Sequence, residues 1–144
     1  MRVQTKNLGP IILCGALLAI YGCSSTPDDM PEVGTVTGVV TLDGKPLEQA
    51  QVSFSPENGR TSTGTTDASG TYELTYTPTV QGAKIGKHSV RISTFQEPEG
   101  DLDNEEQLKG GREELVPEKY NKQTTLTADV KAGENTFDFE LKSE

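Results

Sequence analysis

The feature that most constrains the fold is a repeated alternation of apolar and polar residues with a period of two. Val52 and Phe54, for example, alternate with Gln51 and Ser53. Successive side chains of a β-strand point to opposite faces, so this pattern is typical of strands with one buried face. No segment shows a convincing 3.6-residue period, so almost no helix is expected. The alternating segments are 35–42, 50–55, 72–77, 88–93, 126–131 and 136–142, and a polar, Thr-rich segment, 60–66, is expected at a sheet edge.

Gly- and Pro-containing tetrapeptides separate these segments, notably at Asp43–Pro46, Pro56–Gly59 and Asp67–Gly70. Gly accepts a positive φ and Pro presets φ, so both favour tight turns. Asp67 is expected to accept hydrogen bonds from amides two and three residues on. The seven segments and their turns predict an all-β fold, a seven-stranded antiparallel β-sandwich over residues 34–144.

Residues 97–118 interrupt the pattern, because nine of these 22 residues are acidic. We predict a long, mobile and solvated acidic loop. Its oxygen-rich stretch Asp101–Glu106 suggests a loose calcium site. An EF-hand loop needs Gly at its sixth position and Glu at its twelfth, where this chain has Glu106 and Arg112. A solvated run of charges is therefore the favoured interpretation, and no metal site is predicted.

The start of the chain has the organisation of an export signal. Arg2 and Lys6 precede an almost wholly apolar run, Leu8 to Tyr21, of about 14 residues. As a helix this run would rise roughly 21 Å, short of the hydrocarbon core of about 30 Å, so it is a poor permanent span. We therefore expect residues 1–22 to be removed after export.

The end of this run, Ile20-Tyr21-Gly22-Cys23, resembles the cleavage box of bacterial lipoproteins. The resemblance implies a lipoprotein signal peptide at 1–22, lipidation (such as palmitate) of Cys23, and a lipidated N-terminus and flexible tether at 23–33. The implied location is the cell envelope, with the chain held to a membrane through its lipid anchor. Ser24, rather than Asp, favours the outer membrane, facing the periplasm or the cell surface. The alternative is an ordinary secretory signal with a chance cysteine.

Composition excludes several classes of site. With 22 acidic and 13 basic residues the net charge is -9, which disfavours nucleic acid as a partner. Cys14 and Cys23 are the only cysteines, and both are assigned above, so the domain has no disulfide or thiolate metal site. The single histidine, His88, is in register with inward-facing residues and is interpreted as a core residue rather than a base. No catalytic set and no cofactor are predicted, so the protein is not expected to be an enzyme.

Three segments resemble the opening of carboxypeptidase regulatory-like domains: Gly38–Leu47, Ala50–Phe54 and Thr66–Tyr72. A later segment, Gly86–Ile92, resembles the strand that such domains place after the hairpin, and Val116–Asn121 resembles a segment of small bacterial lipoproteins built on this domain. The resemblance implies a transthyretin-like, seven-stranded β-sandwich that is mostly non-catalytic. A related hydroxyisourate hydrolase uses several histidines, an arginine and a Tyr-Arg-Gly-Ser tail. Here there is one histidine, and the chain ends Leu-Lys-Ser-Glu.

These patterns predict a structural or interaction module of the cell envelope, with an envelope protein or a glycan as its partner. The alternative is a carbohydrate- or peptide-binding module. The triplet Lys119, Tyr120 and Asn121 is the candidate interaction site, although Tyr120 is favoured as a plug for the core. Buried aromatic rings would favour the scaffold, whereas coplanar exposed rings would favour binding. The rings that decide this are Tyr72, Tyr76, Tyr120 and Phe95.

Overall fold

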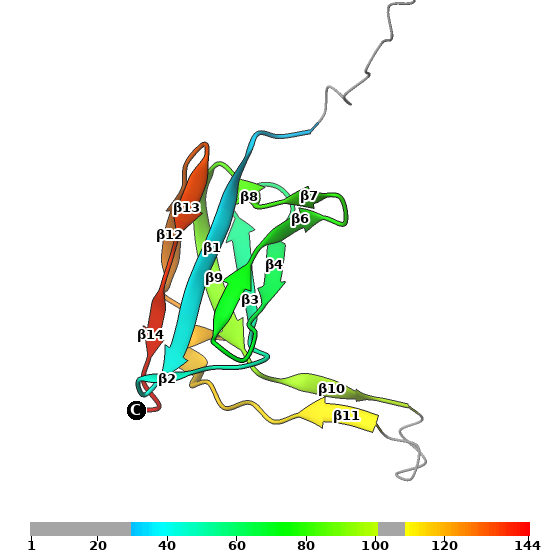
Figure 1. The fold of residues 1–144 in the computed structure, drawn as a ribbon, viewed down its shortest axis with the longest axis vertical. Helices are drawn as coiled ribbons and strands as arrows, with labels where there is room; N and C mark the ends of the chain where they lie inside the picture. The colour runs from blue at the N-terminus through cyan, green and yellow to red at the C-terminus, as the bar shows by residue number, and fades with distance from the viewer. Residues whose placement is uncertain (1–29, 101–108) are drawn as a thin grey trace, which may run out of the picture. The chain divides into compact units, whose positions relative to one another are not determined.

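The computed structural model describes residues 30–100 and 109–144, and these residues form an all-β, sandwich-like fold of two main sheets and one two-stranded ribbon (Figure 1). The only helical element among them is a 3₁₀ turn, η2. The elements are β1 (Val33–Leu42), β2 (Lys45–Pro46), β3 (Gln51–Pro56), β4 (Ser62–Thr65), β5 (Thr71–Glu73), β6 (Thr75–Thr77), β7 (Val80–Gln81), β8 (Ala83–Lys84), β9 (Gly86–Ser93), β10 (Gln96–Glu99), β11 (Lys109–Arg112), η2 (Glu118–Tyr120), β12 (Thr127–Val130), β13 (Glu134–Thr136) and β14 (Phe139–Leu141).

Strand β1 is the centre of the first sheet. One of its sides pairs antiparallel with β8, β5 and β2, and the other pairs parallel with β13 and β14. The expectation of purely antiparallel pairing is therefore wrong for this sheet. The chain enters β13 from β12 in the other sheet, so no hairpin joins β13 to β1 and imposes an antiparallel direction.

The second sheet has the order β12-β9-β3-β4-β6-β7 and is antiparallel throughout. Strand β4, expected at an edge because of its polar sequence, lies between β3 and β6. The reason is that Ser62 and Thr66 turn inward and are buried, while Thr63 pairs with Thr75 of β6. Thr66 is tolerated inside because its Oγ1 donates to the Leu47 carbonyl and accepts the Ala50 amide, whereas the buried Ser62 Oγ has no hydrogen-bond partner among the described residues.

The core lies between the two sheets and contains the apolar residues that the alternation assigned to it. Fully buried examples are Val52, Phe54, Val90 and Ile92. Four predicted core residues, Leu42, Leu126, Phe137 and Phe139, are partly buried against the same cluster. Val116, from the acidic segment, joins the core as well. The predicted strand register is therefore confirmed.

The run Tyr72–Tyr76 contributes a short strand to each of the two sheets, which the alternation alone does not indicate. Its first half, β5, pairs with β1, and its second half, β6, pairs with β4. Between them the Leu74 amide bonds to the Val36 carbonyl. One apolar face is kept along the whole run, because all the inward side chains enter the shared core.

In the first sheet, the backbone at Gly38 of β1 lies very close to the backbone at Phe137. The Tyr72 hydroxyl, itself almost fully buried, donates to the Phe137 carbonyl at 2.7 Å. A Cβ on Gly38 would lie 1.8 Å from that same carbonyl oxygen, so only glycine fits at this position. The chain between β13 and β14 is thus held against β1.

Two of the predicted turns are present, the second with hydrogen bonds that differ in part from those expected. Asp43 and Gly44 have φ of 52° and 79°, the two-residue geometry that joins β1 to β2 as a hairpin. Asp67 Oδ1 accepts the Ser69 and Thr71 amides, two and four residues on rather than two and three. Gly70 is left-handed, with φ of 75°, and its amide bonds to the Asp67 carbonyl instead.

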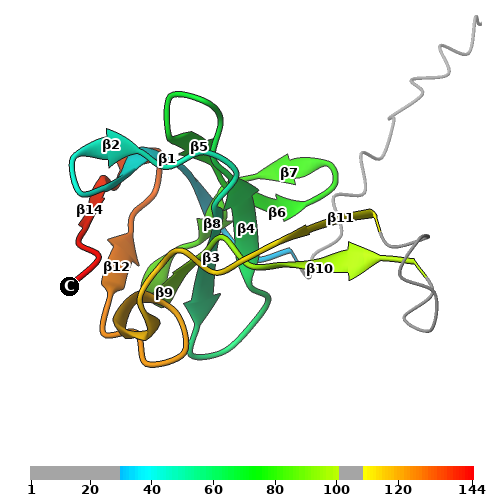
Figure 2. The same cartoon turned by 90° about the horizontal axis from the view of Figure 1, so that it is seen from below.

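In the predicted acidic loop 97–118, the described residues 97–100 and 109–118 are ordered, which corrects the expectation of a mobile loop for these residues. Its two ends form the β10–β11 ribbon, which projects from the two sheets (Figures 1 and 2). At the base of the ribbon Arg112 Nη1 donates to the Glu48 carbonyl at 2.9 Å. The acidic composition predicted a solvated loop because strand pairing uses backbone groups, and the charges of the side chains give no information about that pairing.

Several predictions concern residues outside the described ranges. These are the signal peptide at 1–22, lipidation of Cys23, most of the tether at 23–33, and the oxygen-rich stretch 101–106. Within the part of the chain that the structure describes, no helix has the length and apolar character needed to cross a membrane.

Candidate functional site

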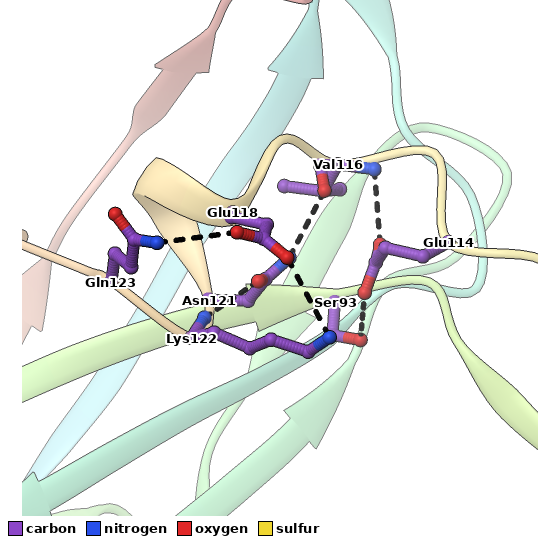
Figure 3. A network of polar contacts seen from close by, with 7 residues as sticks. All are labelled: Ser93, Glu114, Val116, Glu118, Asn121, Lys122 and Gln123. Atoms are coloured by element: carbon purple, nitrogen blue, oxygen red, sulfur yellow. Dashed lines mark hydrogen bonds and ion pairs between the residues drawn. The ribbon is translucent and has the colours of Figure 1, made fainter.

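The last residues of β9 and the segment after β11 surround a surface hollow of about 330 Å³, here called the Phe95 hollow. Its walls are Arg91, Ser93, Phe95, Glu114, Glu118, Asn121 and Lys122. The phenyl ring of Phe95 is 56% exposed, which is unusual for a large apolar side chain in this domain. Figure 3 shows how the polar residues around this hollow are connected.

Glu114 forms the centre of that polar network. Its carboxylate accepts hydrogen bonds from the Ser93 hydroxyl, from the Thr94 amide at 2.9 Å and from the Val116 amide at 3.0 Å. Burial alone would raise the pKa of Glu114, but the hydrogen bonds from Ser93, Thr94 and Val116 outweigh it, so the pKa lies below its ordinary value. The ionised carboxylate therefore fastens the segment after the ribbon to the end of β9.

The rim of the hollow carries an exposed ion pair. Lys122 Nζ lies 3.6 Å from Glu118 Oε1, and Gln123 Nε2 donates to Glu118 Oε2 (Figure 3). Exposed pairs of this kind contribute about 0–1 kcal/mol, so this one tunes the local charge more than the stability.

The three consecutive residues of the predicted triplet have different roles in the structure. Asn121 is buried, and its side chain donates to the Val116 carbonyl and accepts the Lys122 amide. Tyr120 is half-buried against the core, and its hydroxyl accepts the Lys142 amide. Lys119 is exposed, lies over the Tyr120 ring and donates to the Glu144 carbonyl. These contacts match the plug interpretation of Tyr120, and the triplet's binding role stays a prediction.

His88 lies where the alternation placed it, buried near the start of β9. Its Nε2 donates to the Lys84 carbonyl at 2.7 Å, and its ring packs against Phe54. Nδ1 has no hydrogen-bond partner within the described ranges. The imidazole therefore supports the strand from inside the core and lines none of the hollows described in this section.

A second hollow, of about 420 Å³, also has Phe95 in its lining and is called the Gln51 hollow. It is lined by Gln49, Gln51, Thr65, Ser93, Thr94, Phe95 and Gln96. Phe95 and Ser93 line both hollows, so the two hollows adjoin at these residues. In the sequence, nothing separates Phe95 from the three tyrosines as a candidate binding ring.

The rings of the three tyrosines do not form an exposed platform. Tyr72 and Tyr76 are buried, and Tyr120 is half-buried, so Phe95 alone of the four rings is exposed. By the criterion set above, the three tyrosines favour the scaffold, and Phe95 is the one ring of the four that is available for binding. Glu114 was missed because nothing in an acidic run distinguishes one carboxylate from its neighbours. Residues 30–100 and 109–144 contain no group of acidic, histidine or cysteine side chains able to hold a metal.

Comparison with known proteins gave little. No family model matches the chain, and no curated protein matches it. Among solved structures, it is similar to a DUF3823 family protein from Parabacteroides merdae, with 16% identity and a TM-score of 0.39. The match covers 78% of this chain and 47% of that protein, so the chain spans about half of its length.

Proposed function

We propose that the protein is a lipoprotein of the bacterial cell envelope, whose β-sandwich is a non-catalytic structural or interaction module. The observation that carries the non-catalytic part is how the polar side chains of the Phe95 hollow and the buried His88 are used. Glu114 and Asn121 each bind backbone amides or carbonyls, and His88 binds a backbone carbonyl. Groups engaged in this way hold segments of the fold in place rather than converging on a reacting atom.

We further propose that the sandwich is a carboxypeptidase regulatory-like, transthyretin-like domain with seven principal strands. The support is local: the motif turn at Asp43 and Gly44 is a tight hairpin, and the turn from Asp67 to Gly70 is closed by its own carboxylate. Both belong to the segments that carry the resemblance.

The anchor is supported by the cleavage box ending at Cys23 and by the short apolar run before it. A lipid chain contributes about 0.8 kcal/mol per buried methylene, and two or more chains give stable attachment. The tether that follows would let the domain stand off the membrane surface.

The test uses the two cysteines as a matched pair. Wild-type, Cys23→Ala and Cys14→Ala chains are expressed in a bacterium with labelled palmitate, and the envelope fractions are separated. We expect wild type and Cys14→Ala to carry label and to sediment with membranes, and Cys23→Ala to carry none. Label retained by Cys23→Ala would overturn the proposal.

A further inference from the structure

The outer face of the second sheet has an unusual composition for so acidic a chain. Strand register places Arg91, Ser53, Thr63 and Thr75 in one row across β9, β3, β4 and β6. The next row holds Ser89 and Ser55. These six residues, here called the hydroxyl face, are Ser53, Ser55, Thr63, Thr75, Ser89 and Arg91. None is a carboxylate, although the chain has 22 acidic residues.

Most side chains of the hydroxyl face are available to a ligand, although the Ser55 hydroxyl is hydrogen-bonded to that of Thr61. Their neighbours in sequence, such as Val52, Phe54 and Val90, fill the core, so these residues point outward. Ser53, Thr63, Thr75 and Ser89 make no side-chain hydrogen bond to other residues that the structure describes. The nearest carboxylate along β12, Asp129, lies at the sheet edge and pairs with Lys131.

The exposed ring of Phe95 lies beyond the end of β9, next to this face. Of the two hollows that share Phe95, one is also lined by Arg91 and the other by Gln51 and Thr65. Gln51 and Thr65 pair with each other in β3 and β4, so the Gln51 hollow continues the sheet surface. An exposed aromatic ring, an amide, a guanidinium and hydroxyls thus occur on one continuous surface, which the carboxylates of Glu114 and Glu118 border at the Phe95 hollow.

The chemical groups on this surface suit a sugar better than a peptide strand or a nucleic acid. Strands β9 and β3 are each paired on both sides, so their backbone groups offer nothing to an added peptide strand. The net charge of -9 disfavours a phosphate backbone. Hydroxyl, amide and guanidinium groups can exchange hydrogen bonds with sugar hydroxyls, and an exposed ring can cover the apolar face of a sugar.

We propose that the hydroxyl face and Phe95 bind a neutral polysaccharide chain, with one sugar ring stacked on Phe95. This deepens the interaction role proposed above and rests on it, but it does not require the lipid anchor.

The test is electrophoresis of the full-length protein, in non-ionic detergent, through native gels containing dextran, galactomannan, xyloglucan or laminarin. We expect at least one polysaccharide to retard the wild type. Phe95→Ala should weaken binding about tenfold, as expected for loss of one stacked ring. Leu115→Ala is the matched control, because Leu115 is 57% exposed and lines neither hollow.

A second pair of variants tests the face independently of the ring. Ser53→Asp places a carboxylate at the centre of the hydroxyl face and should abolish retardation, whereas Thr136→Asp, on the exposed side of β13, should not. Melting curves confirm that each variant is folded. No retardation of the wild type in any gel, or equal retardation of wild type and Phe95→Ala, would overturn the inference. A lipidated protein that no gel retards contradicts the glycan site alone, and a retarded protein without lipid contradicts the anchor alone.

Discussion

Replacing Tyr72 by Phe removes one hydroxyl and leaves the packing of the ring in place. That hydroxyl donates at 2.7 Å to the Phe137 carbonyl, and so ties β5 to the chain between β13 and β14. Losing such a bond, with its acceptor left in a partly buried position, costs about 1–2 kcal/mol. With a urea dependence of about 1.5 kcal/mol per molar, the unfolding midpoint should fall by about 1 M.

The assay is urea unfolding followed by far-ultraviolet circular dichroism, with Tyr76→Phe as the control. Tyr76 is also buried, but its hydroxyl makes no hydrogen bond to other residues in the described ranges, so its midpoint should stay nearly constant. Burial, aided by the charge of Asp138, raises the pKa of the Tyr72 hydroxyl well above its ordinary value. The hydroxyl therefore remains a donor, and the difference between the variants should be the same at pH 6 and pH 8. Equal midpoints for the two variants would refute the reasoning.

Three further predictions test the register, the carboxylate network and the close backbone contact. Phe139→Asp should unfold the domain, because the Phe139 ring packs against the core, whereas Glu140→Ala should leave the melting temperature nearly unchanged; equal losses would contradict the register. Glu114→Gln should be less stable than wild type at pH 7. Because the folded-state pKa of Glu114 is lowered, this difference should shrink as the pH falls from about 5 through that pKa, and a constant difference would contradict the role of the ionised carboxylate. Gly38→Ala should lower the melting temperature by about 10 °C or more, because its methyl group would collide with the Phe137 carbonyl; an unchanged melting curve would contradict the close contact.

The predictable part of the fold is the part that period-two alternation encodes. Val52, Phe54, Val90 and Ile92 are buried as expected, because a residue's parity along a strand decides which face it occupies. Alternation is the same in parallel and antiparallel strands. It could not show that β13 runs parallel to β1, nor that the run from Tyr72 divides between sheets.

The candidate site was less predictable, because its residues act through contacts distant in sequence. Glu114 binds the Ser93 hydroxyl and the Thr94 amide, about 20 residues earlier, and its acidic neighbours conceal it. Phe95 is distinguished only by its exposure, which depends on where the β10–β11 ribbon leaves the sheet. Asn121, by contrast, is a candidate from the sequence, and in the structure its buried side chain donates a hydrogen bond to the Val116 carbonyl.

The most direct test of the proposed anchor is the intact mass of the protein purified from its native membranes. The account predicts a chain that starts at Cys23 and carries the added mass of a diacylglyceryl group. An intact Met1 terminus with no fatty acid would contradict it.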